Sequence, residues 1–209
     1  MTNEEILESW RKPIENAVLD TFHRFKAEPK TILTESDLKC NLYMYLINQK
    51  PYVQYAVHTE VTHYIGSRDD NGSRKYRFRD MSLLCPWLIK DNEELWGREE
   101  TLSKGFKHKG PAIHIELKIQ RQSENEIIQI NQEDITNLND LQITTGREKR
   151  YVIVWLSRQN NIDTIVNTAL NALNIINNQV IKELIEVYLI DKNHCKKLFF
   201  ENNWVPIDL

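Results

Sequence analysis

The sequence lacks the features that mark secreted, disulfide-bonded or membrane-spanning proteins. Its three cysteines, Cys40, Cys85 and Cys195, lie far apart without a C-x-x-C pair, which argues against a disulfide framework and a structural zinc site. No apolar run approaches the roughly 20 residues that cross a bilayer, and the start of the chain lacks the basic and apolar segments of a signal peptide. We therefore expect a cytoplasmic protein that has no membrane contact, with its cysteines as small buried residues.

The chain also lacks internal repeats, low-complexity segments and a linker rich in proline, glycine or serine. Its 209 residues suffice for one domain with a full hydrophobic core and barely for two. We predict one domain over residues 1–209: an N-terminal helical extension (1–30), a core (34–157), and a C-terminal helix with strands (158–209).

A strong excess of positive charge is absent as well. The net charge is −3, which argues against a protein that binds nucleic acid over its whole surface. Residues 68–121 nevertheless carry 12 Lys/Arg and 9 Asp/Glu, a local balance of +3, so the remainder carries −6. A local basic groove therefore stays compatible with the composition.

Apolar residues at helical spacing predict the helices. A stripe over residues 6–25 predicts the first helix, which Pro13 should kink or divide. Thr34-Glu35-Ser36-Asp37 resembles a capping box and predicts the start of a second helix, followed by Pro51 beyond its end. Its apolar face consists of Leu38, Leu42, Tyr45 and Leu46. Residues 131–141 and 162–176 predict two further helices.

Runs rich in β-forming residues predict the strands. Residues 52–65 and 74–84 flank Asp70-Asn71-Gly72 and predict a hairpin. Residues 112–120 alternate between isoleucine or leucine and polar residues, which predicts a strand with one buried and one polar face. Residues 151–156 predict a strand that is covered on both faces. Residues 185–190 and 197–200 predict a pair of strands near the end of the chain. This order predicts an α/β or α+β domain with a central mixed sheet flanked by helices.

The polar face of the third strand carries the candidate chemistry. Glu116 and Lys118 project from the same face, roughly 7 Å apart along the strand. Such a carboxylate can bind a hard cation that neutralises phosphate charge, and the ammonium can polarise an attacking water. A second carboxylate is needed, and Asp80 near the end of the preceding strand can supply it.

The triplet [DE]-x-K alone is weak evidence, because a chain of this composition contains about two by chance. It occurs three times here. Glu28-Pro29-Lys30 lies in an expected linker, and Asp37-Leu38-Lys39 on an expected helix, where positions two apart do not face each other. Only Glu116-Leu117-Lys118 lies on a strand that follows a strand with an aspartate.

With this order of elements, the region from about residue 34 to residue 156 resembles the PD-(D/E)XK nuclease superfamily, which includes restriction enzymes, junction resolvases and repair nucleases. The resemblance implies a restriction-endonuclease-like αβββαβ core with N- and C-terminal elaborations. The sequence departs from the motif of this superfamily at one position, because Arg79 stands where the motif has proline before Asp80. Glu60 on the first hairpin strand is the alternative carboxylate.

The resemblance implies a metal-dependent endonuclease that hydrolyses DNA phosphodiester bonds. Asp80, Glu116 and the Leu117 carbonyl would bind Mg²⁺, for which Mn²⁺ would substitute, and Lys118 would position the water. Gln120 would touch the scissile phosphate, and Glu35 would lie near a second metal. Restriction or junction resolution would favour a homodimer; no small-molecule cofactor is implied.

Basic residues near this centre are candidates for binding the DNA backbone. They lie on the hairpin, in the loop before the third strand and just after it: Arg74, Lys75, Arg77, Arg79, Lys104, Lys107, Lys109 and Arg121.

Several alternatives stay open. The hairpin cations can equally form a solvated face, Glu35 can simply complement the helix dipole, and Glu116 with Lys118 can be an exposed ion pair. The whole protein can be a catalytically idle nuclease-fold module that binds DNA or protein, or an unrelated α+β interaction module. We interpret the histidines, including His58 and His114, as structural or surface residues because they lack metal-ligand spacing.

Overall fold

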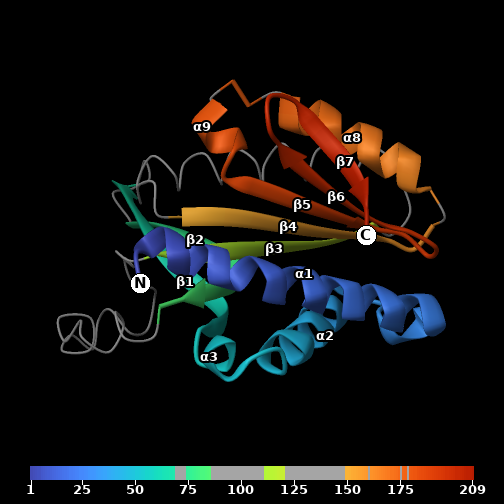
Figure 1. Cartoon of the computed structure of the whole chain (residues 1–209), viewed down its shortest axis with the longest axis horizontal. Coiled ribbons are helices and arrows are strands. Elements are labelled where there is room, and N and C mark those ends of the chain that lie inside the picture. The colour runs from blue at the N-terminus through green and yellow to red at the C-terminus, as the bar shows by residue number, and fades with distance from the viewer. Residues whose placement is uncertain (69–73, 86–110, 121–148, 160, 175, 178) are drawn as a thin grey trace.

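One mixed β-sheet with helices on both faces organises the protein (Figure 1). The computed structural model describes residues 1–68, 74–85, 111–120, 149–159, 161–174, 176–177 and 179–209. Helices α1 (Asn3–Ala27) and α2 (Glu35–Ile47) lie on one face of the sheet, and α8 (Ile162–Asn174) on the other. The mixed α/β class that the sequence predicts is therefore confirmed.

The sheet has seven strands, ordered as they follow along the chain. They are β1 (Val57–Arg68), β2 (Arg74–Leu84), β3 (Ala112–Gln120), β4 (Lys149–Ser157), β5 (Ile185–Ile190), β6 (Cys195–Phe200) and β7 (Trp204–Asp208). Short helical turns complete the described elements: η1 (Pro29–Thr31), α3 (Pro51–Gln54) and α9 (Gln179–Lys182). Within the described residues, no helix combines the length and the apolar character needed to cross a membrane.

Two parallel pairings lie at the centre of an otherwise antiparallel sheet. Strand β3 pairs in parallel with β4, and β4 with β5, while every other neighbouring pair is antiparallel. A parallel pair needs a crossover connection. Helix α8 provides it between β4 and β5. Between β3 and β4 the connection is residues 121–148, so the helix predicted over 131–141 lies outside the described residues.

The predicted bounds hold best where the sequence pattern is regular. Strands β2, β3 and β5 begin and end where the sequence predicts, and helix α2 begins within one residue of its predicted start and ends before Pro51. The strand predicted from residue 52 is wrong at its start, because Pro51–Gln54 form a helical turn and β1 begins at Val57. Proline favours the first position of a helix, which explains this turn. The predicted hairpin turn at residues 70–72 lies outside the described residues.

Two further expectations need correction, on the cysteines and on the first helix. Cys85 and Cys195 are buried as expected, but Cys40 is exposed. Helix α1 continues through Pro13, so the predicted division of this helix is wrong. Pro13 removes one hydrogen bond, but it is buried together with Trp10 and Ile14, and this packing holds both halves of the helix. Strand β7 was not predicted; it lies at the edge of the sheet, where Pro206 is tolerated.

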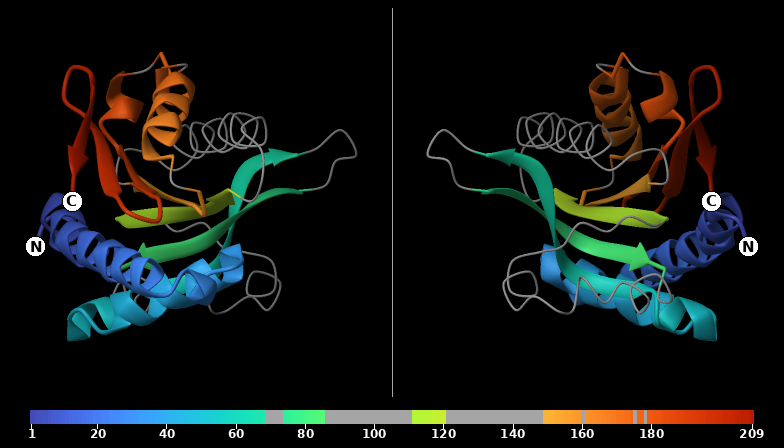
Figure 2. Two further views of the ribbon diagram at one scale, coloured as in Figure 1. Left: turned by 90° about the vertical axis from the view of Figure 1, so that its right-hand side faces the viewer. Right: turned by 90° about the vertical axis from the view of Figure 1, so that its left-hand side faces the viewer.

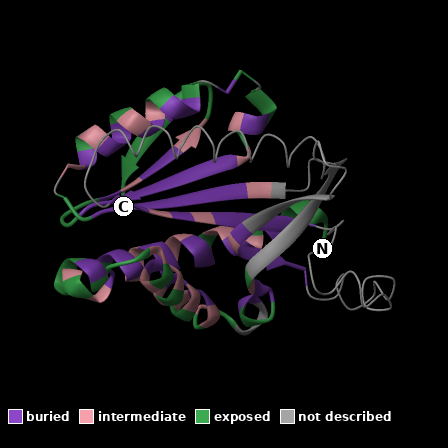
Figure 3. Cartoon of the chain, turned by 180° about the vertical axis from the view of Figure 1, so that it is seen from behind, coloured by how far each residue is buried: buried purple, intermediate pink, exposed green. Residues whose placement is uncertain are grey.

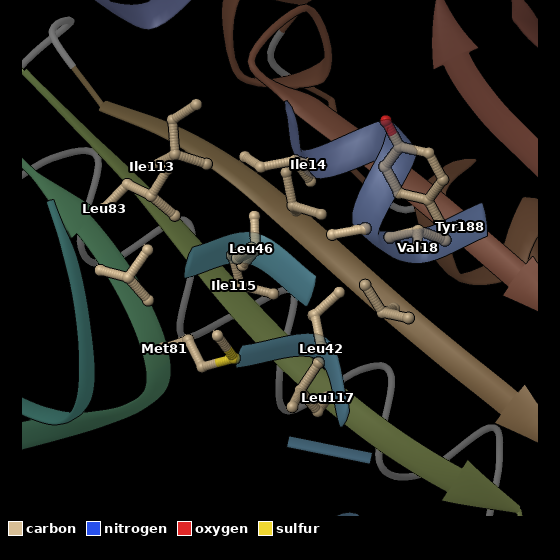
Figure 4. Packing of buried hydrophobic residues seen from close by; sticks show 14 of the residues in the cluster. Ile14, Val18, Leu42, Leu46, Met81, Leu83, Ile113, Ile115, Leu117 and Tyr188 are labelled. Atoms are coloured by element: carbon tan, nitrogen blue, oxygen red, sulfur yellow. The ribbon is translucent and has the colours of Figure 1, made fainter. Parts of the chain in front are cut away.

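The larger core lies between the sheet and helices α1 and α2. The isoleucine and leucine face of β3 points into it, opposite apolar residues of both helices (Figure 4). The residues labelled in Figure 4 are Ile14, Val18, Leu42, Leu46, Met81, Leu83, Ile113, Ile115, Leu117 and Tyr188. This packing fixes which face of β3 carries its polar residues.

A second core covers the opposite face of the sheet under α8. Tyr151, Ile153 and Trp155 of β4 contribute to it, whereas Val152 and Val154 belong to the first core. Strand β4 is therefore buried on both faces, as its unbroken apolar run predicts, and Figure 3 shows the central strands as mostly buried, with a few intermediate positions.

A partly buried ionic network joins α1 to β5 and β6. Glu186 on β5 contacts Arg11 of α1 and lies 3.0 Å from Nζ of Lys197 on β6. Lys197 also lies 3.3 Å from Glu15 of α1, and the Tyr188 hydroxyl donates to Glu186 at 3.1 Å. Burial, together with the nearby Glu186 charge, raises the pKa of Tyr188. The network therefore ties the first helix to strands near the end of the chain.

The predicted capping box at the start of α2 is confirmed. The Thr34 hydroxyl accepts from the Asp37 N–H at 3.1 Å, and the Asp37 carboxylate accepts from the N–H groups of Leu33 and Thr34 at 3.0 and 2.9 Å. These bonds, that from Leu33 foremost, lower the pKa of Asp37 below its ordinary value. The capping box fixes where α2 begins.

We expect Asp37→Asn to lower the free energy of unfolding at pH 7 by an amount that shrinks as the pH falls. A lowered folded-state pKa means that the carboxylate stabilises the fold above the unfolded-state value of about 3.9 and loses this effect as the pH falls through the folded-state pKa. Urea denaturation from pH 7 to pH 3 measures the difference. Asp163→Asn, in the first turn of α8, is the control; equal pH dependence of both variants would contradict the assignment.

Candidate active site where β2 leaves β3

Strands β2 and β3 pair over only part of their length. Their pairing runs from Leu84 with Ala112 to Met81 with Ile115, whereas β2 continues beside β1 as far as Arg74. Figure 2 shows the β1–β2 hairpin curving away from the rest of the sheet. Asp80 and Glu116 are therefore the first residues beyond the last β2–β3 pair.

Asp80 occupies the gap that opens between the two strands. Its Oδ2 accepts a hydrogen bond from the Leu117 N–H at 2.9 Å, which replaces the bond that a paired β2 would supply. Since the N–H and C=O of one strand residue point to the same neighbour, the Leu117 carbonyl also faces this gap. The gap thus gathers a carboxylate and a carbonyl oxygen.

Glu116 lies beside two cations. Its Oε1 is 3.1 Å from the Lys118 ammonium, and its Oε2 is 3.4 Å from the Arg79 guanidinium. Glu116 is 12% exposed and Arg79 only 2%. The structure therefore brings Asp80, Glu116 and Lys118 to one place and adds Arg79 to them. Arg79 does not belong to a solvated hairpin face.

Helix α2 contributes a further cation. The Lys39 ammonium lies 3.9 Å from Oδ1 of Asp80, and both side chains are partly exposed. Glu35 is one helical turn earlier on the same face of α2. Its predicted place near a second metal stays a prediction.

Gln120 ends the polar face of β3. It is 4% exposed, and neither its amide nitrogen nor its amide oxygen has a hydrogen-bond partner in the described part of the chain. An unsatisfied buried polar group costs about 1–3 kcal/mol. A ligand that both donates and accepts would remove this cost, which makes Gln120 a candidate contact residue.

Away from the gap, the polar face continues as a buried pair. The Ser82 hydroxyl and Nδ1 of His114 are 2.9 Å apart, and both residues are buried. His58 lies opposite Ser82 on β1, and burial lowers the pKa of His58 below its ordinary value. These histidines are therefore part of the sheet's packing, next to the site.

The oxygen atoms at the gap suit a hard cation. Two carboxylates, Asp80 and Glu116, and the Leu117 carbonyl are the oxygen groups assembled there. Among the described residues, no three His, Cys, Asp or Glu side chains gather as one metal-binding group. Mg²⁺ commonly uses only one or two carboxylates and retains several waters, so this donor set fits it.

Several predicted residues cannot be placed. Lys104, Lys107, Lys109 and Arg121 lie outside the described residues, and the side chains of Arg74, Lys75 and Arg77 on β2 are likewise not described. Glu60 lies on β1 between Thr59, which pairs with Met81, and Val61, which pairs with Arg79. Its backbone is thus opposite Asp80, but its side chain is outside the described part.

Lys39 was missed because its role depends on tertiary packing. It belongs to the Asp37-Leu38-Lys39 triplet, which lies on a helix as expected, so its own triplet carries no catalytic pattern. Its proximity to Asp80 follows from how Leu38, Leu42 and Leu46 seat α2 against the sheet. The available signal in the sequence was the position of Lys39 one residue after buried Leu38.

Comparisons of the chain with models of protein families, with curated proteins and with solved structures find no match.

We expect a double-mutant cycle of Arg79→Met and Glu116→Gln to give a coupling free energy of about 1–3 kcal/mol, between the values of exposed and buried ion pairs. Urea denaturation of wild type, both single variants and the double variant measures this coupling. Because Arg79 is buried, its loss should also lower stability by itself. A coupling near zero would mean that Arg79 does not hold Glu116.

Proposed function

We propose that the protein is a metal-dependent nuclease that hydrolyses DNA phosphodiester bonds. In this proposal α2, β1–β3, the connection over residues 121–148 and β4 form a restriction-endonuclease-like core. The observation that carries the proposal is the gap between β2 and β3, where Asp80 bonds to the Leu117 N–H beside Glu116 and Lys118.

The position of these groups supports a catalytic role for Glu116 and Lys118 rather than an exposed surface ion pair. Glu116 and Lys118 are mostly buried, and Asp80 sits on the neighbouring strand at the point of separation. An incidental Glu-x-Lys sequence in an unrelated interaction module would not require an aspartate in this place. The cluster therefore favours the nuclease hypothesis over that alternative.

Asp80, Glu116 and the Leu117 carbonyl would hold a divalent cation, Mg²⁺ or Mn²⁺, at the gap. Such a cation would neutralise phosphate charge and activate water for attack on phosphorus. The protein's own groups would complete the reaction. The Lys118 ammonium would orient the water and offset developing negative charge, and the Gln120 amide would contact the phosphate group.

Buried Arg79 would hold the Glu116 carboxylate in a fixed orientation. A guanidinium is planar and always charged, so it restricts a carboxylate more than a flexible ammonium does. Preorganised groups need little rearrangement when charge develops in the transition state. Arg79 would thus act through Glu116, in contrast to the contact with DNA that the sequence suggested for it.

One observation favours a second candidate function. Both carboxylates already lie next to cations, Asp80 beside Lys39 and Glu116 beside Arg79 and Lys118. A site whose carboxylates are already paired with cations could be catalytically idle and bind DNA through its lysine and arginine side chains alone. This candidate predicts DNA binding without cleavage and without binding of Mn²⁺.

We expect Glu116→Gln to reduce DNA cleavage by about a hundredfold or more, since a metal ion contributes several kcal/mol of transition-state stabilisation. Supercoiled plasmid and single-stranded DNA would be incubated with Mg²⁺, Mn²⁺ or EDTA, and products followed on gels. Glu201→Gln, in the exposed turn before β7, should cleave like wild type.

DNA binding in EDTA should survive the Glu116→Gln change, and circular dichroism would establish that the variant is folded. Cleavage that persists in EDTA, or equal cleavage by Glu116→Gln and wild type, would refute this catalytic centre. Binding without cleavage or Mn²⁺ uptake would favour the second candidate.

We expect Lys118→Ala to reduce the cleavage rate by about a hundredfold while Mn²⁺ binding persists, because the ammonium acts on water and developing charge. Cleavage time courses at saturating Mn²⁺ would measure the rate. Isothermal titration calorimetry would measure the Mn²⁺ affinity. Lys192→Ala, in the exposed turn between β5 and β6, is the matched control. Full turnover by Lys118→Ala would remove Lys118 from the mechanism.

A further inference from the structure

A hydrogen bond between two side chains links β2 to β3 next to the gap. The Ser82 hydroxyl and Nδ1 of His114 are 2.9 Å apart. In the register of the two strands Ser82 is opposite His114, one pair before the last pair, Met81 with Ile115. The bond therefore joins the strands close to the point where their pairing ends.

Burial makes this bond a fixed link between the strands. Ser82 is 0% exposed and His114 is 1% exposed, so bulk water does not compete for either group. A hydroxyl both donates and accepts, which lets it bond to Nδ1 in either neutral tautomer of the imidazole. A hydrogen bond in such surroundings is also electrostatically stronger than one in water.

Both residues lie two positions from a carboxylate of the candidate site. Ser82 follows Asp80 on β2, and His114 precedes Glu116 on β3. Two residues of an extended strand span roughly 7 Å. The spacing of the strands at the Ser82–His114 pair is therefore the point from which the two carboxylates begin to diverge.

A shared cation would be sensitive to this spacing. Mg²⁺ demands near-ideal octahedral geometry with oxygen ligands at about 2.0–2.1 Å. Asp80 and Glu116 come from different strands, so a wider gap would withdraw one carboxylate from a cation held by the other. The bond from the Leu117 N–H orients the Asp80 carboxylate, whereas the paired residues beside the gap set how far apart the strands lie.

We infer that the Ser82–His114 pair positions the two carboxylates of the candidate metal site, by holding β2 and β3 at the separation that one divalent cation requires. This inference rests on the proposed nuclease function. Neither member of the pair is a catalytic residue, because each acts through the carboxylate on its own strand. Loss of the bond should therefore change the affinity for the metal as well as the stability of the fold.

We expect Ser82→Ala to weaken Mn²⁺ binding by about threefold to tenfold, the range that the net contribution of one hydrogen bond allows. Cleavage of DNA at limiting Mn²⁺ should fall by a similar factor. At saturating Mn²⁺ the rate should return close to that of wild type, because excess cation compensates for a weaker site. DNA affinity in EDTA should stay unchanged.

The experiment uses the full chain. Isothermal titration calorimetry gives the Mn²⁺ affinity, and plasmid cleavage is followed over a series of Mn²⁺ concentrations. Ser82→Thr keeps the hydroxyl and should restore most of the affinity. Thr21→Val is the matched control, because it also removes a fully buried hydroxyl, one that donates to the Ala17 carbonyl at 2.7 Å within α1.

A double-mutant cycle separates this bond from the other contacts of His114. The imidazole also lies beside the Tyr151 ring, with 5.7 Å between the ring centroids, so its replacement alters more than one contact. If the bond to Ser82 acts as a unit, the double variant Ser82→Ala/His114→Phe should bind Mn²⁺ no more weakly than His114→Phe alone. Additive losses of Mn²⁺ affinity would overturn the inference.

A purely structural role of the pair gives a different result. Ser82→Ala would then lose stability in urea denaturation, as Thr21→Val does, but would bind Mn²⁺ as tightly as that control. This outcome would overturn the inference. If Ser82→Ala does not fold, Ser82→Cys offers the same test, since a thiol is a weaker donor, and an unchanged Mn²⁺ affinity would again overturn it.

Failure of the proposed function looks different. If wild type binds no Mn²⁺ and does not cleave DNA under any condition, the metal site itself falls, and the positioning role with it. If wild type binds Mn²⁺ and cleaves DNA while Ser82→Ala behaves like Thr21→Val, only the positioning role of the pair is refuted.

Discussion

The alternation of β3 between an apolar and a polar face is the constraint on which the site depends. Ile113, Ile115 and Leu117 are buried against α1 and α2, so the positions between them must point to the other side of the sheet. A shift of register by one residue would turn the isoleucines away from α1 and α2 and place Glu116 and Lys118 in that helical layer. The hydrophobic effect thus selects the arrangement that keeps Glu116 and Lys118 out of the layer between the sheet and helices α1 and α2, although those charges contribute little to the selection themselves.

Separation of β2 from β3 adds the second requirement. A fully paired β2 would satisfy the Leu117 N–H with backbone and leave no room between the strands. Because β2 follows β1 away from the sheet, that N–H is satisfied by a side chain instead, and the side chain is Asp80. A local break in the hydrogen-bond ladder therefore gives both the opening and the orientation of its carboxylate.

Sequence patterns could locate the strands of the site but not all of its residues. The strict alternation over 112–120 determined β3, and the capping box determined α2, because both signals are local. The turn at Pro51–Gln54 and the edge strand β7 were missed, since proline dominates the local preference in both. The contacts of Lys39 and Arg79 depend on how α2 and the hairpin pack on the sheet, and no spacing along the chain encodes that distance.

The ionic network under α1 has a consequence for how the chain folds while it is being synthesised. Arg11 and Glu15 leave the ribosome first, yet their partners Glu186 and Lys197 belong to strands made almost last. Until those strands emerge, Arg11 and Glu15 have only their α1 neighbours Glu8 and Lys12 as described ionic partners and lack the contacts that tie α1 to β5 and β6. Final seating of the first helix therefore waits for nearly the whole polypeptide, so a nascent chain stalled before β6 would carry its hydrophobic surface only partly covered.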